Sequence, residues 1–188
     1  MSRAYRIRIS ESLRRHIKVD DGIQSTLEIL DVLPPEQTQV LLERELEAAG
    51  FEQDEDGMWQ RIDEDGVIVR IDAKESTVTI SAAADEEVDI SRERVVSAWA
   101  ENDARTREQG RKRLNAELEQ EVGEREKDLQ AEVTKRLEGK LGDLRRELDG
   151  ISNRVTAEAL KQKAASMGEV QEVSEDPETG SLTIRVKI

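Results

Sequence analysis

Residues 137–155 read LEGKLGDLRRELDGISNRV, with apolar residues recurring at alternating steps of four and three. This heptad period places the apolar side chains on one stripe of a helix and favours left-handed supercoiling with a second helix. The sequence therefore predicts a coiled-coil seam for oligomerisation, formed by Leu137, Leu141, Leu144, Leu148, Ile151 and Val155.

The helix predicted around this seam extends from Ser91 to Gly168, a stretch without proline that is dense in Glu, Lys, Arg, Leu and Ala. Its apolar stripe begins near Leu114, with steps mostly of four. At about 1.5 Å per residue the helix would exceed roughly 100 Å, so no small domain could bury its stripe. Two arrangements are open: a rod that pairs with another chain, or a helix that folds back at Gly139 and Gly142.

The composition excludes several classes of function. The net charge of -14 opposes binding to nucleic acids and to anionic membranes, which both require clustered lysine and arginine. The chain has no cysteine, which excludes disulfides and thiolate metal sites. It also lacks an N-terminal secretory signal and an apolar run of membrane-spanning length. We therefore expect a soluble cytoplasmic protein.

The first part of the chain, residues 1–84, is predicted to be a small α+β module. Tyr5, Ile7 and Ile9 alternate with polar residues, which is the period of a strand. The Asp-Asp-Gly sequence at residues 20–22 is a turn signal, so a hairpin is expected there.

A helix and a β-meander are predicted to complete this module. The helix should begin at Pro34 and Pro35 and end at Gly50. Residues 54–63 and 63–72 then repeat the pattern Asp-Glu-Asp-Gly, three residues, Arg-Ile-Asp. Because Asp-Gly is a tight-turn dipeptide, the repeat predicts strands separated by turns, continuing to about Ile80. Residues 82–89 are small and acidic, so they are interpreted as a linker, placed at residues 85–90, or as the end of the meander.

The C-terminal residues 169–188 alternate apolar and polar side chains around a turn at residues 176–180, which predicts a β-hairpin. A lone hairpin is marginal, so it should dock on something, such as its copy in a second chain. The predicted fold class is therefore α+β, with an N-terminal module, a linker, a long coiled-coil helix and a C-terminal hairpin at residues 1–84, 85–90, 91–168 and 169–188.

Neither a metal nor a cofactor is expected. Glu52, Asp54, Asp56, Gly57 and Asp63 roughly follow the spacing of a calcium-binding loop, but the end ligands differ from the usual ones. Residues 59–62 also have the character of a strand where a loop is needed, so a hairpin turn is the preferred interpretation. The missing phosphate-loop and dinucleotide glycine patterns make nucleotide hydrolysis by this chain unlikely on sequence grounds.

No catalytic residue is predicted either. His16 is the only histidine, and its neighbours Arg14, Arg15 and Lys18 are basic, so a surface position on a strand is the preferred interpretation. The basic residues near the start are expected on an outward strand face, with binding of an anion or acidic partner as the alternative. Trp99 is expected either to pack the meander onto the helix or to anchor a partner.

Two parts of the chain resemble small accessory proteins of bacterial ternary conflict systems. They are MSRAYRIR at residues 1–8, continuing through LEIL at 27–30 to LPPE at 33–36, and NRVTAEAL at 153–160 with EDPETGSLTI at 175–184. Proteins of this kind accompany an FtsH-type AAA+ ATPase, so the resemblance implies an adaptor in an ATP-driven assembly. It includes no catalytic motif and implies no functional residue.

Together these features predict a non-enzymatic oligomeric scaffold or adaptor acting through a coiled coil and its terminal β modules. Its expected partners are further copies of itself and an AAA+ ATPase or another protein. The alternative is a chaperone-like client holder whose helix is folded into a hairpin.

Overall fold

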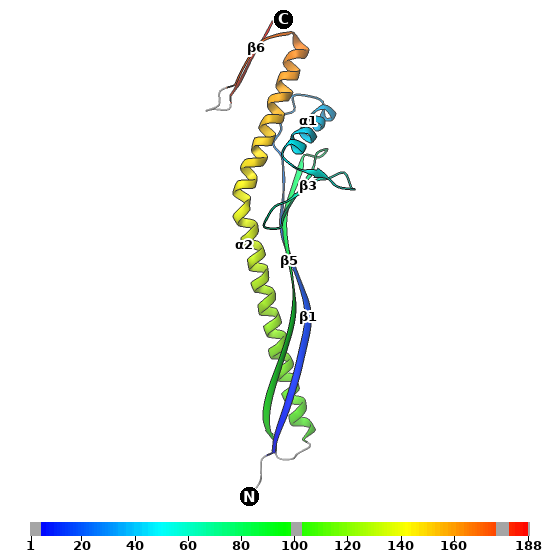
Figure 1. Ribbon diagram of the computed structural model, residues 1–188, viewed down its shortest axis with the longest axis vertical. Coiled ribbons are helices and arrows are strands. Elements are labelled where there is room, and N and C mark those ends of the chain that lie inside the picture. Colours follow the sequence, from blue (N-terminus) through cyan, green and yellow to red (C-terminus); the bar gives the residue numbers. More distant parts are fainter. Residues whose placement is uncertain (1–4, 99–102, 176–180, 188) are drawn as a thin grey trace. The chain divides into compact units, whose positions relative to one another are not determined.

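The computed structural model describes residues 5–98, 103–175 and 181–187, and its fold is mixed α+β (Figure 1). The chain divides into two compact units. Unit 1 comprises residues 1–21 and 83–135, and unit 2 comprises residues 22–82 and 136–188. The elements in chain order are β1 (Tyr5–Thr26), α1 (Pro35–Ala48), β2 (Glu52–Gln53), β3 (Trp59–Ile62), β4 (Val67–Asp72), β5 (Thr77–Ala98), α2 (Ala104–Met167), β6 (Glu169–Glu175) and β7 (Leu182–Lys187).

The strands form one sheet of five strands, in the order β1-β5-β4-β3-β2, and one sheet of two strands, β6-β7. Strands β2 to β5 pair antiparallel with their sequence neighbours, which is the predicted meander. Its inward-facing residues Val67, Val69 and Ile71 are at most 2% exposed, as the period-two pattern requires.

The repeated Asp-Glu-Asp-Gly segments fold into two equivalent turns, as predicted. Asp54 Oδ1 accepts hydrogen bonds from the backbone N–H groups of Asp56 and Met58, and Asp63 Oδ1 does the same for Asp65 and Val67. Each turn ends in a glycine with positive φ, 81° at Gly57 and 75° at Gly66, a conformation that glycine adopts without a Cβ penalty.

Helix α1 also forms where the sequence predicted a helix. It starts at Pro35, within the first turn, where the missing N–H of proline costs nothing. It ends just before Gly50, which has a φ of 81°. Leu41, Leu42 and Leu46 form its buried face.

The predicted hairpin at residues 20–22 is not formed, because this segment is part of strand β1. The side chains of β1 contact those of β5 in the pairs Arg8–Glu93, Arg14–Glu87 and His16–Asp85. In all three pairs the residue numbers add to the same total, as they do along an uninterrupted antiparallel ladder. The long-range pairing with β5 thus overrides the local turn signal.

Strand β5 corrects two further predictions. Residues 85–90 are part of this strand and not a linker, and residues 91–98, predicted as the start of the long helix, are also strand. These residues form a strand because side chains on one side of it are buried. Val88, Val96 and Ala98 all face that side, since alternate residues of a strand share a face. The long helix begins later, at Ala104.

Ile7, Ile9, Ala98 and Leu114 form a core cluster in unit 1, with Val96 packed against it. Gly110 lies under this cluster, and a Cβ at that position would collide with the side chain of Ile9. The absence of a side chain at residue 110 therefore leaves room for the terminal methyl group of Ile9.

Helix α2 contains 64 residues and continues through Gly139 and Gly142 without interruption. The fold-back that a client holder with a helical hairpin would need is therefore not formed. The helix ends at Met167, and the predicted C-terminal hairpin follows as β6 and β7. The turn predicted at residues 176–180 lies outside the described residues.

Candidate interaction surfaces

The predicted oligomerisation seam lies inside unit 2. Leu137, Leu144, Leu148, Ile151 and Val155 are at most 7% exposed within a single chain, and Leu141 is half-buried. Unit 2 also buries the leucines of α1 and the inner residues of β4. Figure 1 shows α1 and β3 beside this part of α2. The seam is therefore buried within a single chain, and a coiled coil is not shown.

Ion pairs between side chains fix the second half of α2 within unit 2. Arg61 of β3 donates hydrogen bonds from both terminal nitrogens to Glu147 of α2, at 2.7 and 2.6 Å. The same guanidinium donates to the backbone oxygen of Ala49 at 2.9 Å and lies 4.5 Å from the centre of the Phe51 ring. Arg61 therefore joins the end of α1, the meander and the helix.

Hydrogen bonds within unit 2 lower the pKa values of three carboxyl groups. The hydrogen bond from Arg61 lowers the pKa of Glu147, and the hydrogen bond from Lys140 lowers the pKa of Asp65. Burial alone would raise the pKa of Asp54, but hydrogen bonds from the Met58 N–H and Arg70 lower it overall. All three carboxylates are thus stabilised in the charged form by partners within the chain.

Asp54 and Asp63, whose spacing resembles that of a calcium-binding loop, also accept hydrogen bonds from groups within the chain. Asp54 accepts hydrogen bonds from its own turn and from Arg70, and residues 59–62 form β3. The described residues contain no group of three or more His, Cys, Asp or Glu side chains placed to hold a metal ion.

In unit 1, charged side chains connect α2 to both strands of the β1–β5 ribbon. On the β1 side, Arg15 contacts Glu119, and Arg111 contacts Glu11. On the β5 side, Arg92 contacts Glu121, Arg94 contacts Glu117, and Arg125 contacts Glu86. The helix therefore lies beneath the inner face of the ribbon, with ion pairs at both flanks of the apolar row.

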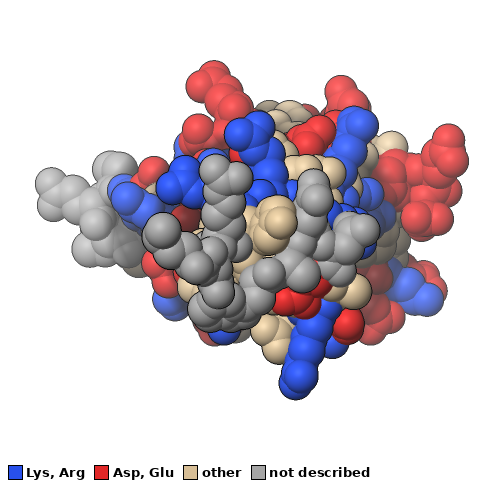
Figure 2. All heavy atoms as spheres, turned by 90° about the horizontal axis from the view of Figure 1, so that it is seen from below, with Lys and Arg blue, Asp and Glu red and all other residues tan. Residues whose placement is uncertain are grey.

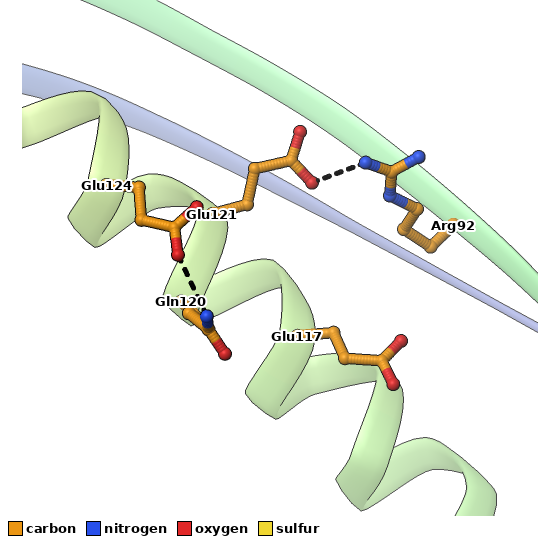
Figure 3. Close-up of a pocket in the computed structure, with 5 residues that line it drawn as sticks. All are labelled: Arg92, Glu117, Gln120, Glu121 and Glu124. Atoms are coloured by element: carbon orange, nitrogen blue, oxygen red, sulfur yellow. Dashed lines mark hydrogen bonds and ion pairs between the residues drawn. The ribbon is translucent and has the colours of Figure 1, made fainter. Parts of the chain in front are cut away.

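A hollow in unit 1 lies along the β5 flank of this contact (Figure 3). Its lining residues are Arg92, Glu117, Gln120, Glu121 and Glu124. The Arg92 guanidinium points to Glu121, and Gln120 donates to Glu124 on the same helix. Glu117, the remaining lining residue, pairs with Arg94 of β5. The geometry is that of an ion-pair contact between α2 and β5.

The single histidine lies on an outward face of the first strand, as the sequence predicted, and so do Arg6, Arg8, Arg14 and Lys18. Arg15 is an exception, because it lies on the inner face and contacts Glu119 of α2. His16 is exposed, and its Nε2 lies 3.3 Å from Asp85 Oδ2. Figure 2 shows basic and acidic side chains intermingled over the face it draws, without a separate basic patch. Trp99 lies outside the described residues.

A family model matches residues 1–188, that is, the whole chain, and its description is FtsH ternary system domain X5. The chain belongs to this family. It is an accessory protein of an FtsH-associated ternary system, in agreement with the resemblance noted in the sequence. Neither a curated protein nor a solved structure matches the chain. In the described part of this family member, no helix is long and apolar enough to cross a membrane.

The C-terminal hairpin of this family member carries a partly uncovered apolar strip. Val170, Leu182, Ile184 and Val186 are half-buried on one face, and Val173 is 44% exposed. The opposite face is polar and includes the cross-strand pair Glu172–Arg185, at 3.1 Å. The alternation of β7 predicted this strip, whereas the shift of pairing between Val170 and Glu172 had no sequence signal.

Sequence reasoning missed Arg61 as a structural centre of unit 2. A signal was present, because the repeat places arginines at equivalent positions 61 and 70. Both arginines form ion pairs, one with Glu147 and the other with Asp54. The identity of those partners depends on long-range packing, which the repeat does not encode.

Proposed function

We propose that this protein is a cytoplasmic, non-enzymatic adaptor that binds the FtsH-type ATPase of its ternary system through the C-terminal hairpin. The family match over the whole chain is the observation that carries the proposal, because it links the chain to an FtsH system. The accessory role agrees with the resemblance to proteins that accompany such ATPases.

The apolar strip of the hairpin is the surface best suited to this role. An isolated hairpin of two strands is marginally stable in water, so covering its apolar face stabilises both the hairpin and the complex. The strip includes Ile184, which pairs with Val173 across the hairpin. Thr183 is exposed on the opposite face of the same strand and provides a matched control position.

The test compares Ile184→Asp with Thr183→Asp in the full-length chain. Binding to the purified FtsH-type ATPase of the same ternary system is measured by surface plasmon resonance. We expect Ile184→Asp to weaken binding at least about tenfold, because a buried unpaired carboxylate costs more than 1.4 kcal/mol. Thr183→Asp should bind like the wild type.

Circular dichroism checks that both variants keep their helix and strand content. Absence of binding between the wild-type chain and the ATPase would refute the proposed partner. Equal binding of the two variants would keep the ATPase as partner but remove the hairpin strip as its docking surface.

A further inference from the structure

The ribbon of unit 1 has two long strand edges without a partner among the described residues. Strand β1 is the last strand of its sheet, so residues 5–21 pair on one side only. Strand β5 pairs with β4 as far as Ala82, so residues 83–98 have β1 as their sheet neighbour and an open second side. Neither stretch contains proline, which blocks strand addition at an edge because it lacks the backbone N–H. Each edge therefore offers a continuous row of backbone donors and acceptors.

The outward faces of the two strands have opposite charge. Along β1 the outward row contains only basic residues from Arg6 to Lys18, apart from two serines. Along β5 the outward row contains carboxylates and no basic residue. The basic row is Arg6, Arg8, Arg14, His16 and Lys18, and the acidic row is Asp85, Glu87, Asp89 and Glu93.

Within one chain these rows already match across the shared edge. Arg8 Nε lies 2.9 Å from Glu93, and Arg14 Nε donates to Glu87 at 2.7 Å. The described residues give Arg6, Lys18 and Asp89 no ion-pair partner. The chain thus demonstrates the pairing of a basic β1 with an acidic β5 and leaves one further edge of each kind open.

We propose that a second copy of this chain adds the open edge of its β5 to the open edge of β1. Pairing β1 with β1 would place basic rows side by side, and pairing β5 with β5 would do the same for acidic rows. Like charges directly opposite each other destabilise a strand pair, whereas opposite charges stabilise it. Charge therefore selects the β1–β5 pairing between copies.

The helix leaves room for this addition. Its ion pairs with Glu11 and Arg15 of β1, and with Arg92 and Arg94 of β5, are all on the inner face of the ribbon. Because each copy then provides one basic and one acidic edge, the contact is head-to-tail. Such an interface forms a ring if the rotation closes and a filament if it does not.

The experiment changes the charge at outward positions without ion pairs in the described structure. One variant reverses two charges of the β1 row, with Arg6→Glu and Lys18→Glu. The other reverses one charge on the outward face of β5 and adds a second positive charge, with Asp89→Lys and Ser91→Lys. The control, Lys127→Glu with Lys135→Glu, makes the same charge change as the β1 variant on exposed positions of α2 in unit 1. Circular dichroism confirms that all the chains are folded.

Sedimentation equilibrium measures self-association at low and high salt. For the wild type and the control we expect masses above the 21.3 kDa of one chain, rising with concentration and falling with salt. Each edge variant alone should associate about tenfold or more weakly, because its two new side chains repel the like-charged row of the second copy. An equal mixture of the two edge variants should recover association, since Glu-bearing β1 then meets Lys-bearing β5.

Two results would overturn the proposal. One is a wild-type chain that stays monomeric at every concentration and salt. The other is a mixture of the β1 variant with wild type that associates more strongly than wild type alone, because this result indicates β1–β1 pairing. Neither result bears on binding of the ATPase through the hairpin.

Discussion

The two units bury the same helix by different means. In unit 1 the apolar row of α2 proceeds in steps of four, through Gly110, Leu114, Leu118 and Val122, under a ribbon of two strands. Steps of four advance the row about 40° around the helix each time, and a twisted ribbon can follow that advance. In unit 2 the steps alternate between four and three, so the row stays on one face under α1 and the meander.

This difference changes how a heptad pattern should be interpreted. An apolar row on one face of a helix must be buried against other residues, which can belong to the same chain or to another chain. In unit 2 they belong to the same chain. The pattern at residues 137–155 therefore identifies a buried face correctly without identifying its partner. Ion pairs hold α2 in both units, to β1 and β5 in unit 1 and to α1 and the meander in unit 2.

The largest expected loss in the free energy of unfolding comes from replacing one buried leucine in each unit by alanine. Leu46→Ala in unit 2 should cost about 4–5 kcal/mol, near the top of the range for buried leucine, because Leu46 is fully enclosed. Leu118→Ala in unit 1 should cost about 2–3 kcal/mol, because the ribbon can move toward the helix and reduce the cavity. Denaturant unfolding measures both values, and hydrogen exchange assigns the loss to its unit. Equal costs would contradict the contrast between the units.

A smaller effect is expected when Arg61 is replaced in unit 2. Arg61→Ala removes two charge-assisted hydrogen bonds to Glu147 and leaves a half-buried carboxylate without its partner, which should cost about 2–3 kcal/mol. The control is Arg146→Ala, whose partner Asp143 is one helical turn away and 74% exposed. Its cost should stay below about 0.5 kcal/mol.

The pH dependence of this loss provides an internal check. Arg61 lowers the pKa of Glu147 from its ordinary value of 4.5, so the pair stabilises the fold fully above that value. Its contribution is lost as the pH falls through the lower pKa of the folded state. The cost of Arg61→Ala should therefore shrink in acid, and a cost independent of pH would show that packing on Phe51 dominates.

Local signals predicted the elements of unit 2 well. The two prolines before α1, the repeated Asp-Gly turns and the alternation of β7 all act over a few residues, and all three produced the expected structure. The long helix was also predicted in type and in its C-terminal end.

Unit 1 was predicted less well because its strands are determined by distant partners. The turn signal at Asp20–Gly22 and the helix-compatible sequence at 91–98 are both overridden when β1 and β5 pair along their length. Arg92 and Arg94, which suit an exposed helix, instead face carboxylates on α2. Of the surfaces, the hairpin strip was readable from its alternation. The opposite charges of the two ribbon edges became visible only after the pairing was known.

The smallest expected effect comes from comparing two glycines of α2, one packed against a side chain and one facing open space. Gly123, also on α2 in unit 1, has open space where a Cβ would lie, so Gly123→Ala should stabilise the protein by about 1 kcal/mol through helix propensity. Gly110→Ala gains the same propensity, but its new methyl group collides with Ile9 of the core cluster. Because Ile9 and Val96 are packed together there, the collision should cancel the gain and leave Gly110→Ala at least about 1 kcal/mol less stable than Gly123→Ala. Thermal and denaturant unfolding of the two variants measure this difference. Equal stabilisation by both would mean that the ribbon of unit 1 yields easily enough to accommodate the added methyl group.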